Sequence, residues 1–404
     1  MIHRPTSRPR GSRRHRAAIG LGAALAAVVA FGAGCVPNAK QDSLNPRGHY
    51  AETIYNLVVP VFIVGGIISV LVIGVTIYFA VRYRAKGDET DDENIPEPVH
   101  GNTALELGWT ITPALILLVI GFATVVTIFK LDKQPPEQNP HVEVVGQQWW
   151  WEFRYDLGGA GTKESDRTYS DIVTANDMVI PAGTDISLRM SSRDVIHGWW
   201  VPELQGKRDV VPGRTTMFNV AADEPGTYFG QCTVICGLSH ANMRFTVIAL
   251  PPAEYEKWLE EQQKPAVMPT SGLAAEGAEL FKTQCGECHT VRGIHEAPPP
   301  DKSPLTAGAA PDLTHLMSRP TFASGMFDLR IDSKRCVAKG LYFAEDPSCI
   351  NSAELRAWLH DPPAMLPMAA EESDIEKNEV RGMPDLGLSP SALDQLVAFL
   401  ETLK

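Results

Sequence analysis

Two long uncharged segments constrain most strongly what this chain can fold into. Residues 55–81 and 109–129 contain no charged side chain over 27 and 21 positions. A bilayer core is crossed by a helix of about 20 apolar residues, so both segments are predicted to be membrane spans. Arg82, Arg84 and Lys86 directly follow the first span. The positive-inside rule therefore places the link between the spans on the cytoplasmic side and the rest of the chain outside.

The N-terminus has the layout of an export signal. Residues 1–34 contain six arginines and no acid, then an Ala/Gly-rich apolar run that ends in small residues before Cys35. The sequence "GAGC" resembles a bacterial lipoprotein box, with Gly32 where leucine is usual. We expect a signal peptide over 1–34 and a lipid on Cys35. A plain signal peptidase cut and an uncleaved anchor remain open.

The body of the chain is acidic. The formal net charge is −12, and the six N-terminal arginines mean that residues 35–404 carry −18. This charge argues against nucleic acid as a partner, and it suits either a basic protein partner or simple solubility. A length of 404 residues favours two or three folded units.

The part after the second span divides into two predicted domains. Residues 132–262 contain short alternating or β-branched runs broken by Gly, Pro, Asn and Asp, which predicts an antiparallel β-sandwich with a short terminal helix. Residues 263–273 contain proline, glycine and serine and are predicted to be a linker. Residues 274–404 lose the strand pattern and are predicted to form an all-α domain. Residues 35–131 hold the N-terminal segment and the two-helix hairpin.

A cluster of soft metal ligands lies near the end of the β domain. The stretch "CTVICGLSHANM" places Cys232, Cys236, His240 and Met243 within twelve residues, and His197 lies 35 residues before the first cysteine. Thiolate and thioether ligands favour copper or iron-sulfur chemistry over hard cations. A remote histidine with a late ligand loop is typical of cupredoxins, and two cysteines allow two bridging thiolates between two coppers. Met243 and a backbone carbonyl are expected to be weak axial ligands.

Two other interpretations of this cluster remain. Zinc prefers closed tetrahedral Cys/His sets and does not use methionine. A disulfide between Cys232 and Cys236 suits an oxidising compartment, but it gives no role to His197 and Met243.

The all-α domain carries a haem-attachment motif. In "CGECH", Cys285 and Cys288 supply two thioether links and His289 is the proximal ligand. A redox-active cysteine pair is the alternative. The preceding helix and the helix begun by "LSPSALDQLVAFL" resemble those of a class I cytochrome c, which implies that they cross at Gly277 and Phe399.

The second axial ligand of the haem is expected to be a methionine. Five methionines lie in this domain: Met317, Met326, Met365, Met368 and Met383. We expect Met383, because "GMPDLGLS" before the last helix matches the methionine loop of that family, with Met368 and Met365 as alternates. "APDLTHL" resembles the segment whose proline carbonyl, here that of Pro311, accepts the N–H of the haem histidine.

Two of the seven cysteines have no role in lipid, copper or haem attachment. Cys35, the copper pair and the haem pair account for five. The remaining Cys336 and Cys349 are expected to form a disulfide in the exported compartment, which stabilises by about 3 kcal/mol.

Residues 50–262 resemble subunit II of the haem-copper cytochrome c oxidases. The resemblance is carried by "LELGWTITPALIL", "QQWWWEFRY", "DVIHGWWVPEL", "KRDVVPGR" and "GQCTVICGLSHANM". It implies a dinuclear CuA centre with the carbonyl of residue 234 as a ligand. Since the family usually has Glu where this chain has Val234, the magnesium ion held by that carboxylate at the border with subunit I is in doubt.

Other roles follow from the same resemblance. Trp149, with Trp150 beside it, matches the aromatic at which electrons enter, and Glu106 matches the acid at the mouth of a proton path. The expected protein is subunit II of a proton-pumping oxidase, fused to a cytochrome c, in the bacterial cell membrane. Its expected partners are subunit I, the other oxidase subunits, membrane lipid, and a cytochrome c or bc-type complex as electron donor. The linker of about ten residues would hold the two redox domains at a millimolar effective concentration.

Two other functions remain open. One is a CuA subunit of a nitric oxide reductase. The other is a stand-alone, membrane-tethered copper and haem protein, whose full ligand set argues against a copper carrier.

Overall fold

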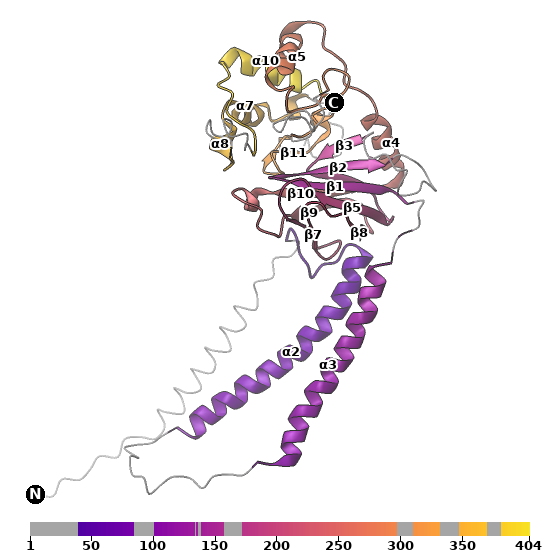
Figure 1. The fold of residues 1–404 in the computed structure, drawn as a ribbon, viewed down its shortest axis with the longest axis vertical. Coiled ribbons are helices and arrows are strands. Elements are labelled where there is room, and N and C mark those ends of the chain that lie inside the picture. The colour runs from indigo at the N-terminus through magenta and orange to yellow at the C-terminus, as the bar shows by residue number, and fades with distance from the viewer. Residues whose placement is uncertain are drawn as a thin grey trace, which may run out of the picture. The chain divides into compact units, whose positions relative to one another are not determined.

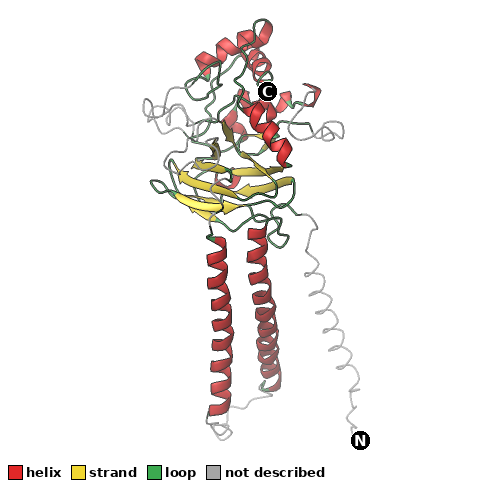
Figure 2. Ribbon diagram, turned by 90° about the vertical axis from the view of Figure 1, so that its right-hand side faces the viewer, coloured by secondary structure: helices red, strands yellow, loops and turns green. Residues whose placement is uncertain are grey.

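The computed structural model describes residues 39–84, 101–133, 135, 139–156, 172–296, 310–331, 347–369 and 381–404. Ser43–Lys404 form one compact unit. The expected signal peptide, Cys35 and Cys336 lie outside the described residues. The architecture is a two-helix hairpin, a β-sandwich and a helical domain, which confirms the fold class expected from the sequence (Figures 1 and 2).

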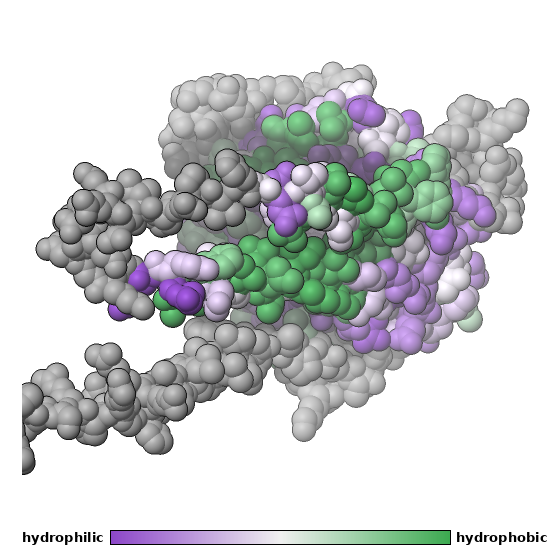
Figure 3. Space-filling model, turned by 90° about the horizontal axis from the view of Figure 1, so that it is seen from below, coloured by the Kyte–Doolittle hydropathy of each residue, from purple (hydrophilic) through white to green (hydrophobic). Residues whose placement is uncertain are grey.

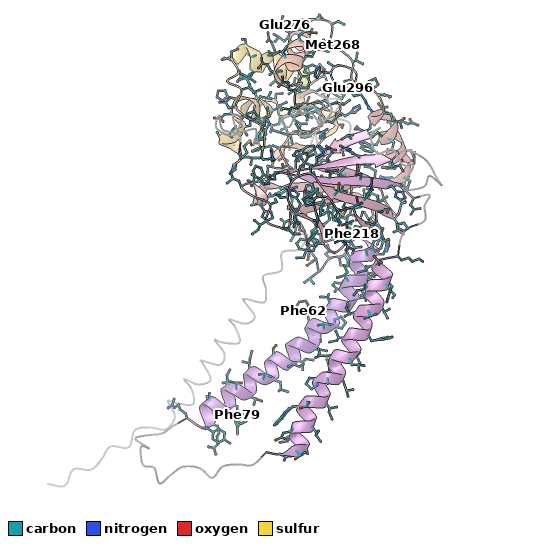
Figure 4. All side chains as sticks on the ribbon, in the orientation of Figure 1. Phe62, Phe79, Phe218, Met268, Glu276 and Glu296 are labelled. Atoms are coloured by element: carbon teal, nitrogen blue, oxygen red, sulfur yellow. The ribbon has the colours of Figure 1, made fainter. Side chains whose placement is uncertain are left out.

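The two predicted spans lie within two long helices. Helix α2 covers His49–Arg82 and α3 covers Thr103–Leu131, and both are long and apolar enough to cross a membrane. Their side chains are largely exposed within the chain, and in Figure 4 Phe62 and Phe79 stand out from α2, with 72% and 50% of their surface exposed. Seen from below, the hairpin is a continuous apolar surface with polar residues around it (Figure 3). Such a surface suits a lipid environment.

Helix α2 is anchored to the β domain at its start. At 1.5 Å per residue its 34 residues extend about 51 Å, well beyond the roughly 30 Å of a bilayer core. The surplus first turn docks on the β domain, where the Ala51 N–H donates to the carbonyl oxygen of Leu204 at 3.1 Å. A Cβ on Gly48 would lie 2.1 Å from the carbonyl oxygen of Ala221, so only glycine allows this close approach.

The β domain has ten strands among its described residues. Their bounds are β1 His141–Gln147, β2 Trp150–Asp156, β3 Ile172–Ala175, β4 Asp177–Pro181, β5 Ile186–Ser192, β6 His197–Trp199, β7 Arg208–Val210, β8 Thr216–Val220, β9 Gly226–Gln231 and β10 Arg244–Leu250. One sheet has the order β3-β2-β1-β5-β8, a second has β4-β10-β9, and β6 pairs with β7. Aromatic side chains from both sheets, among them Trp151, Trp199 and Phe245, fill the core between them.

The sequence pattern predicted an antiparallel sandwich, but each of the two larger sheets contains one parallel pair of strands. β1 runs parallel to β5, and β10 runs parallel to β4. Both pairs join strands that are distant along the chain. Local alternation of apolar residues shows which face of a strand is buried. It does not show whether a strand from a distant part of the chain pairs in parallel or antiparallel orientation, so the parallel pairs could not be predicted from the sequence pattern.

The helical domain follows α4, Pro252–Gln262, which packs on the β domain through the buried Tyr255 and Trp258. Its elements are α5 Gly272–Gln284, η4 Leu316–Ser318, β11 Thr321–Phe322, β12 Phe327–Asp328, η5 Pro347–Cys349, α7 Ser352–His360, α8 Pro362–Met365 and α10 Pro390–Leu400. Helix α10 begins at a capping serine: the Ala392 N–H donates to Ser389 Oγ at 3.3 Å, and Pro390 is the first helical residue.

Helices α5 and α10 cross at Gly277, as the resemblance to cytochrome c implied. A Cβ on Gly277 would lie 2.0 Å from the carbonyl oxygen of Gln395 and 2.9 Å from Cβ of Phe399. The rings of Phe281 and Phe399 pack beside this crossing with centroids 5.3 Å apart. The absence of a side chain at residue 277 therefore sets the distance between the helices.

The segment between the two domains is bound to the helical domain over part of its length. His315 Nε2 lies 3.0 Å from the carbonyl oxygen of Lys264, and the Ala266 N–H donates to the Arg292 carbonyl at 2.9 Å. Met268, labelled in Figure 4, packs against the core of the helical domain. Residues 264–268 are thus a docked strap, whereas the sequence suggested a free tether.

A buried carboxylate begins strand β4. Asp177 is 4% exposed, Thr246 Oγ1 donates to its Oδ1, and within the described part of the chain its Oδ2 has no hydrogen-bond partner. Burial raises the pKa of Asp177 to about 7, while the Thr246 hydroxyl and the Arg319 guanidinium oppose the rise. The folded chain therefore favours the protonated acid.

Gly277→Ala should destabilise the helical domain. The added methyl group must push α5 and α10 apart, and such overpacking typically costs about 1–3 kcal/mol. Thermal unfolding of the full chain, followed by the haem absorption, should show a lower transition temperature. Leu273→Ala, at an exposed position one turn earlier in α5, is the matched control. Equal transition temperatures for the two variants would contradict the close crossing.

Asp177→Asn should change how stability depends on pH. With a folded pKa of about 7 against 3.8 unfolded, the folded state binds the extra proton between these values. The stabilisation is therefore full below pH 4 and is lost as pH rises to 7. Relative to wild type, the variant should gain roughly 3 kcal/mol more free energy of unfolding at pH 8 than at pH 5. Chemical denaturation at both pH values measures the difference, and Asp209→Asn, at an exposed acid, should show none.

Candidate copper and haem sites

Five soft or aromatic-nitrogen ligands converge between strands β9 and β10. Cys232, Cys236 and His197 are buried, and their ligand atoms lie within 4.8 Å of one another. Met243, at the end of the same loop, is fully buried. His197 comes from strand β6, so two segments of the chain build the cluster.

Each thiol has its own histidine. Cys232 Sγ lies 3.9 Å from His197 Nδ1, and Cys236 Sγ lies 3.5 Å from His240 Nδ1. The two sulfurs are 3.7 Å apart, and Met243 Sδ is 3.8 Å from Cys236 Sγ. The carbonyl oxygen of Val234 completes the set at 3.2 Å from Cys232 Sγ. Two soft sulfurs between two imidazoles form a donor set that fits two copper ions.

The disulfide alternative for this pair is wrong. A disulfide has an S–S distance of about 2.05 Å, whereas Cys232 and Cys236 are both free and their sulfurs are 3.7 Å apart. Zinc leaves the buried Met243 without a role.

The fold holds the loop by backbone contacts. The Cys232 N–H donates to the Met243 carbonyl at 2.9 Å, which closes the loop on itself, and the Thr233 N–H donates to the Gly198 carbonyl at 2.9 Å. A Cβ on Gly198 would lie 2.4 Å from Thr233 Oγ1, so glycine is needed where β6 passes under the loop. These contacts fix the distance between His197 and the cysteines.

Asp194 orients the remote histidine, and the sequence interpretation missed this residue. Its Oδ1 lies 2.8 Å from His197 Nε2, which leaves Nδ1 facing Cys232. The Gln148 N–H donates to Asp194 Oδ2 at 2.7 Å. Carboxylates that hydrogen-bond a ligand histidine fix its ring orientation. An acid three residues before a ligand histidine was the available signal.

Electrostatics in the cluster favour a thiolate at Cys232. The hydrogen bond from the Cys236 thiol, and that from His197, lower the pKa of Cys232 to about 3 despite burial. The pKa of Cys236 is raised because its neighbour takes the negative charge first. Burial would lower the pKa of His197, but its contacts with Asp194 and Cys232 outweigh burial and raise it. A bound cation would lower the pKa of Cys236 as well, so that both sulfurs could serve as thiolate ligands.

The tryptophan run lies directly behind the copper loop. Trp149 Nε1 donates to the carbonyl oxygen of Cys236 at 3.1 Å, and Gln148 Nε2 donates to the same oxygen at 2.7 Å. Trp149 and Trp150 are each 7% exposed. Glu106 lies elsewhere, in the first turn of α3, at the end of the hairpin away from the β domain (Figure 1).

A cavity of about 580 Å³ lies next to the haem motif of the helical domain. Cys285, Cys288 and His289 line it together with apolar side chains, and this combination of two thiols, an imidazole and an apolar slot fits a covalently bound haem. Those apolar side chains include Phe281, Leu313, Leu316, Phe322, Leu355, Trp358, Leu359, Leu366, Leu386, Leu396 and Leu400. The cavity wall on the other side comes from the β domain and includes Gln148, Trp149, Asn176 and Arg193.

His289 is oriented from behind. Its Nδ1 lies 2.8 Å from the carbonyl oxygen of Pro311, so Nε2 is left for the iron. Burial lowers the pKa of His289, which keeps the imidazole neutral as a metal ligand must be. Burial and the neighbouring Cys288 raise the pKa of Cys285 to about 12, so the unmodified thiol stays protonated.

Two of the five methionines line the cavity. Met383 packs against the core of the helical domain, while Met368 packs against the core of the β domain. Met365 lines a separate shallow pocket with His360, and Met317 is buried in the helical core. Met326 is not among the residues that line the cavity. Met383 and Met368 are therefore the two methionines placed beside the cavity, and Met383 is the one that packs against the helical domain's own core.

Cys349 is disulfide-bonded. Its expected partner, Cys336, lies outside the described residues.

Three protein families match this chain. Residues 141–250 match the periplasmic domain of cytochrome c oxidase subunit II, residues 40–126 match the transmembrane domain of the same subunit, and residues 274–326 match cytochrome c. The three matches coincide with the β domain, the hairpin and the first part of the helical domain seen in the structure.

Similar curated proteins carry the same subunit name. Cytochrome c oxidase subunit 2 of Alkalihalophilus pseudofirmus is 31% identical over 94% of this chain and 96% of its own length. That of Bacillus sp. strain PS3 is 30% identical over 70% of this chain and 72% of its own length. Quinol oxidase subunit 2 of Bacillus cereus is 31% identical over 55% of this chain and 73% of its own length.

Met383→Ala should remove the sixth ligand of the haem. The ferric protein should lose the weak long-wavelength absorption band of methionine-ligated haem, and the reduction potential should fall by on the order of 0.1–0.3 V, because thioether ligation raises it. Met368→Ala and Met365→Ala are the matched controls, and both should keep the band. Loss of the band in Met368→Ala alone would assign the ligand to Met368 instead.

Proposed function

This chain belongs to the cytochrome c oxidase subunit II family, and from this premise we propose that it is the electron-input subunit of a proton-pumping oxidase. Its fused cytochrome domain receives electrons, its copper domain takes them over, and subunit I uses them to reduce oxygen to water. The chain itself does not carry out the oxygen chemistry. The observation that carries the proposal is the paired Cys–His geometry of the copper cluster directly behind Trp149.

The family implies copper and haem c, and we propose two coppers in a dinuclear CuA centre. When bound, each of these groups takes up and passes on single electrons. The proposed copper ligands are His197, Cys232, Cys236, His240, Met243 and the carbonyl oxygen of Val234. The proposed haem ligands are Cys285, Cys288, His289 and Met383.

The chain's own residues do the positioning. Asp194 keeps the His197 ring turned toward Cys232, and the closed loop keeps the donors fixed, so that gain or loss of an electron requires little movement. Trp149 connects the cavity wall to the Cys236 carbonyl, which supports its role as the point where electrons enter the copper domain, with Trp150 beside it. Pro311 holds His289.

An apolar surface at the tip of the copper loop supports a large protein partner. Ile235 and Leu238 are 85% and 64% exposed, and Val195 and Ile196 beside the loop are 37% and 43% exposed. A group of exposed aliphatic side chains around a metal site is typical of an interface. We propose that subunit I covers this surface and that Glu106 serves its proton path from the other end of the hairpin.

Three further assignments belong to the same proposal. Val234 offers no carboxylate, so a magnesium ion at the subunit I border has no ligand from this residue. The hairpin crosses the cell membrane twice, with both redox domains on the extracytoplasmic side. The N-terminus is processed as a signal peptide, with a lipid on Cys35 and a disulfide between Cys336 and Cys349.

The electron donor is proposed to be a basic cytochrome c or a bc-type complex. The acidic balance of the chain supports a basic partner, because complementary charge accelerates encounter. The complete copper ligand set and the haem cavity favour this donor over a quinol. A CuA subunit of a nitric oxide reductase is the second candidate, since that reaction would also take place on another subunit.

Copper loading of the full chain should yield a delocalised dinuclear centre. Low-temperature EPR should show a seven-line hyperfine pattern, as expected for one electron shared by two copper nuclei, together with near-infrared absorption. Asp194→Asn should keep the copper content while altering the spectrum, because His197 loses its charged hydrogen-bond partner. A four-line spectrum in wild type would rule out the dinuclear site.

The assembled membrane complex should consume oxygen with reduced cytochrome c. Cys236→Ser should abolish this uptake, because one bridging thiolate is lost. Uptake of nitric oxide instead of oxygen by the wild-type complex would support the second candidate, and failure to co-purify any haem-containing membrane subunit would favour a stand-alone protein.

A further inference from the structure

A strained turn of the helical domain faces the copper domain. Between β11 and β12, Ala323, Ser324 and Gly325 have φ values of 48°, 60° and 70°. The left-handed conformation costs a non-glycine residue roughly 1–2 kcal/mol. Two such residues in succession require compensation from their surroundings, and strain of this kind clusters where a chain binds something.

The turn makes two hydrogen bonds across the domain boundary. Ser324 Oγ donates to the carbonyl oxygen of Trp149, and the Arg244 N–H donates to the carbonyl oxygen of Ser324 at 3.3 Å. The left-handed backbone turns both groups of Ser324 toward the copper domain. The two hydrogen bonds to the β domain thus offset the backbone strain of the turn.

Both partners of Ser324 are directly connected to the copper loop. Arg244 follows the buried Met243 in sequence. Trp149 donates through its indole nitrogen to the Cys236 carbonyl at 3.1 Å. On the other side, Ala323 and Ser324 line the cavity that contains Cys285, Cys288 and His289. One turn therefore touches the haem cavity and the support of the copper ligands at once.

A second contact region fixes the orientation. The strap at 264–268 binds the helical domain, and Gln262 Nε2 of α4 donates to Ser318 Oγ at 3.3 Å. Held at the strap and at the turn, the helical domain keeps one face toward Trp149.

We propose that Ala323–Gly325 is a docking turn and that Ser324 is a positioning residue for electron passage between the two domains. The turn holds the haem cavity against Trp149 in one orientation, so transfer occurs within a docked pair of domains and needs no diffusional search on a tether. The inference rests on the proposed function and deepens it. It also means that Trp149, 7% exposed, is closed to a soluble donor, which must dock on the helical domain.

Amide hydrogen exchange on the full chain tests the docking without any redox activity. The Arg244 N–H exchanges only when its bond to Ser324 opens, so its rate reports the opening equilibrium. Ser324→Ala removes the hydroxyl bond to Trp149 and should accelerate this exchange about fivefold. Gly325→Val places a β-branched residue in the left-handed region and should accelerate it about tenfold.

Gly213→Val is the matched control. Gly213 has a φ of 71°, and among the described residues no atom beyond its chain neighbours lies within 4 Å of the position that a Cβ would take. The substitution therefore brings the same backbone strain without a contact between domains. It should leave the Arg244 exchange unchanged. Unchanged exchange in both turn variants would overturn the docking turn.

A kinetic measurement tests the positioning role. In the chain loaded with copper and haem, electrons introduced at the helical domain should reach the copper domain more slowly in Ser324→Ala, and at least severalfold more slowly in Gly325→Val. In both variants the absorption spectra and the two reduction potentials should stay at wild-type values. Wild-type transfer rates despite faster Arg244 exchange would overturn the role of Ser324. The absence of any transfer in wild type would instead overturn the proposed function, and the exchange result on docking would stand.

Discussion

Two cysteine sulfurs held 3.7 Å apart in a dry interior are the constraint on which the rest of the β domain depends. Neither sulfur can be left as an isolated buried charge, because that would cost far more than the fold can supply. The loop therefore brings an imidazole to each sulfur and closes through the Cys232–Met243 backbone bond. The close contact between Gly198 and Thr233 also holds the His197 strand against this loop.

The second level of organisation is a set of side chains that belong to both sites. Asp194 contacts His197 and also lines the haem cavity, and the Gln148 backbone donates to the same carboxylate. Trp149 contacts both sites: its indole N–H donates to the Cys236 carbonyl of the copper loop, and its own carbonyl accepts from Ser324 at the haem cavity. Each site is therefore supported by residues that the other site also uses.

Much of this molecule was predictable from local sequence. The uncharged spans, the "CTVICGLSHANM" loop and the "CGECH" motif are signals that lie within short stretches of sequence. The crossing at Gly277 followed only from the resemblance to cytochrome c, because its two helices are far apart along the chain. The parallel pairing of β1 with β5 was not predictable in this way, because direction is set by partners more than 40 residues apart.

The residues of the site that were not predicted from the sequence were missed for the same reason: their roles depend on contacts with distant parts of the chain. Asp194 was visible in sequence next to His197, but an acid there becomes an orienting group only once the ring nitrogen is known to face it. Ser324 had no local signal at all, since a serine in a short turn is ordinary until Trp149 is placed beside it. The strap at 264–268 looked flexible by composition, and its bonds to Arg292 and His315 are long-range.

The shared wall of the haem cavity has a consequence for biosynthesis. The residues that form it, Gln148, Trp149, Asn176 and Arg193, all precede the helical domain along the chain. Because domains emerge and fold from the N-terminus onward, that wall can form before the helical domain is complete. The haem cavity is therefore completed last, on a surface that the earlier domain has already built, and a copper domain that fails to fold leaves its neighbour with an open cavity.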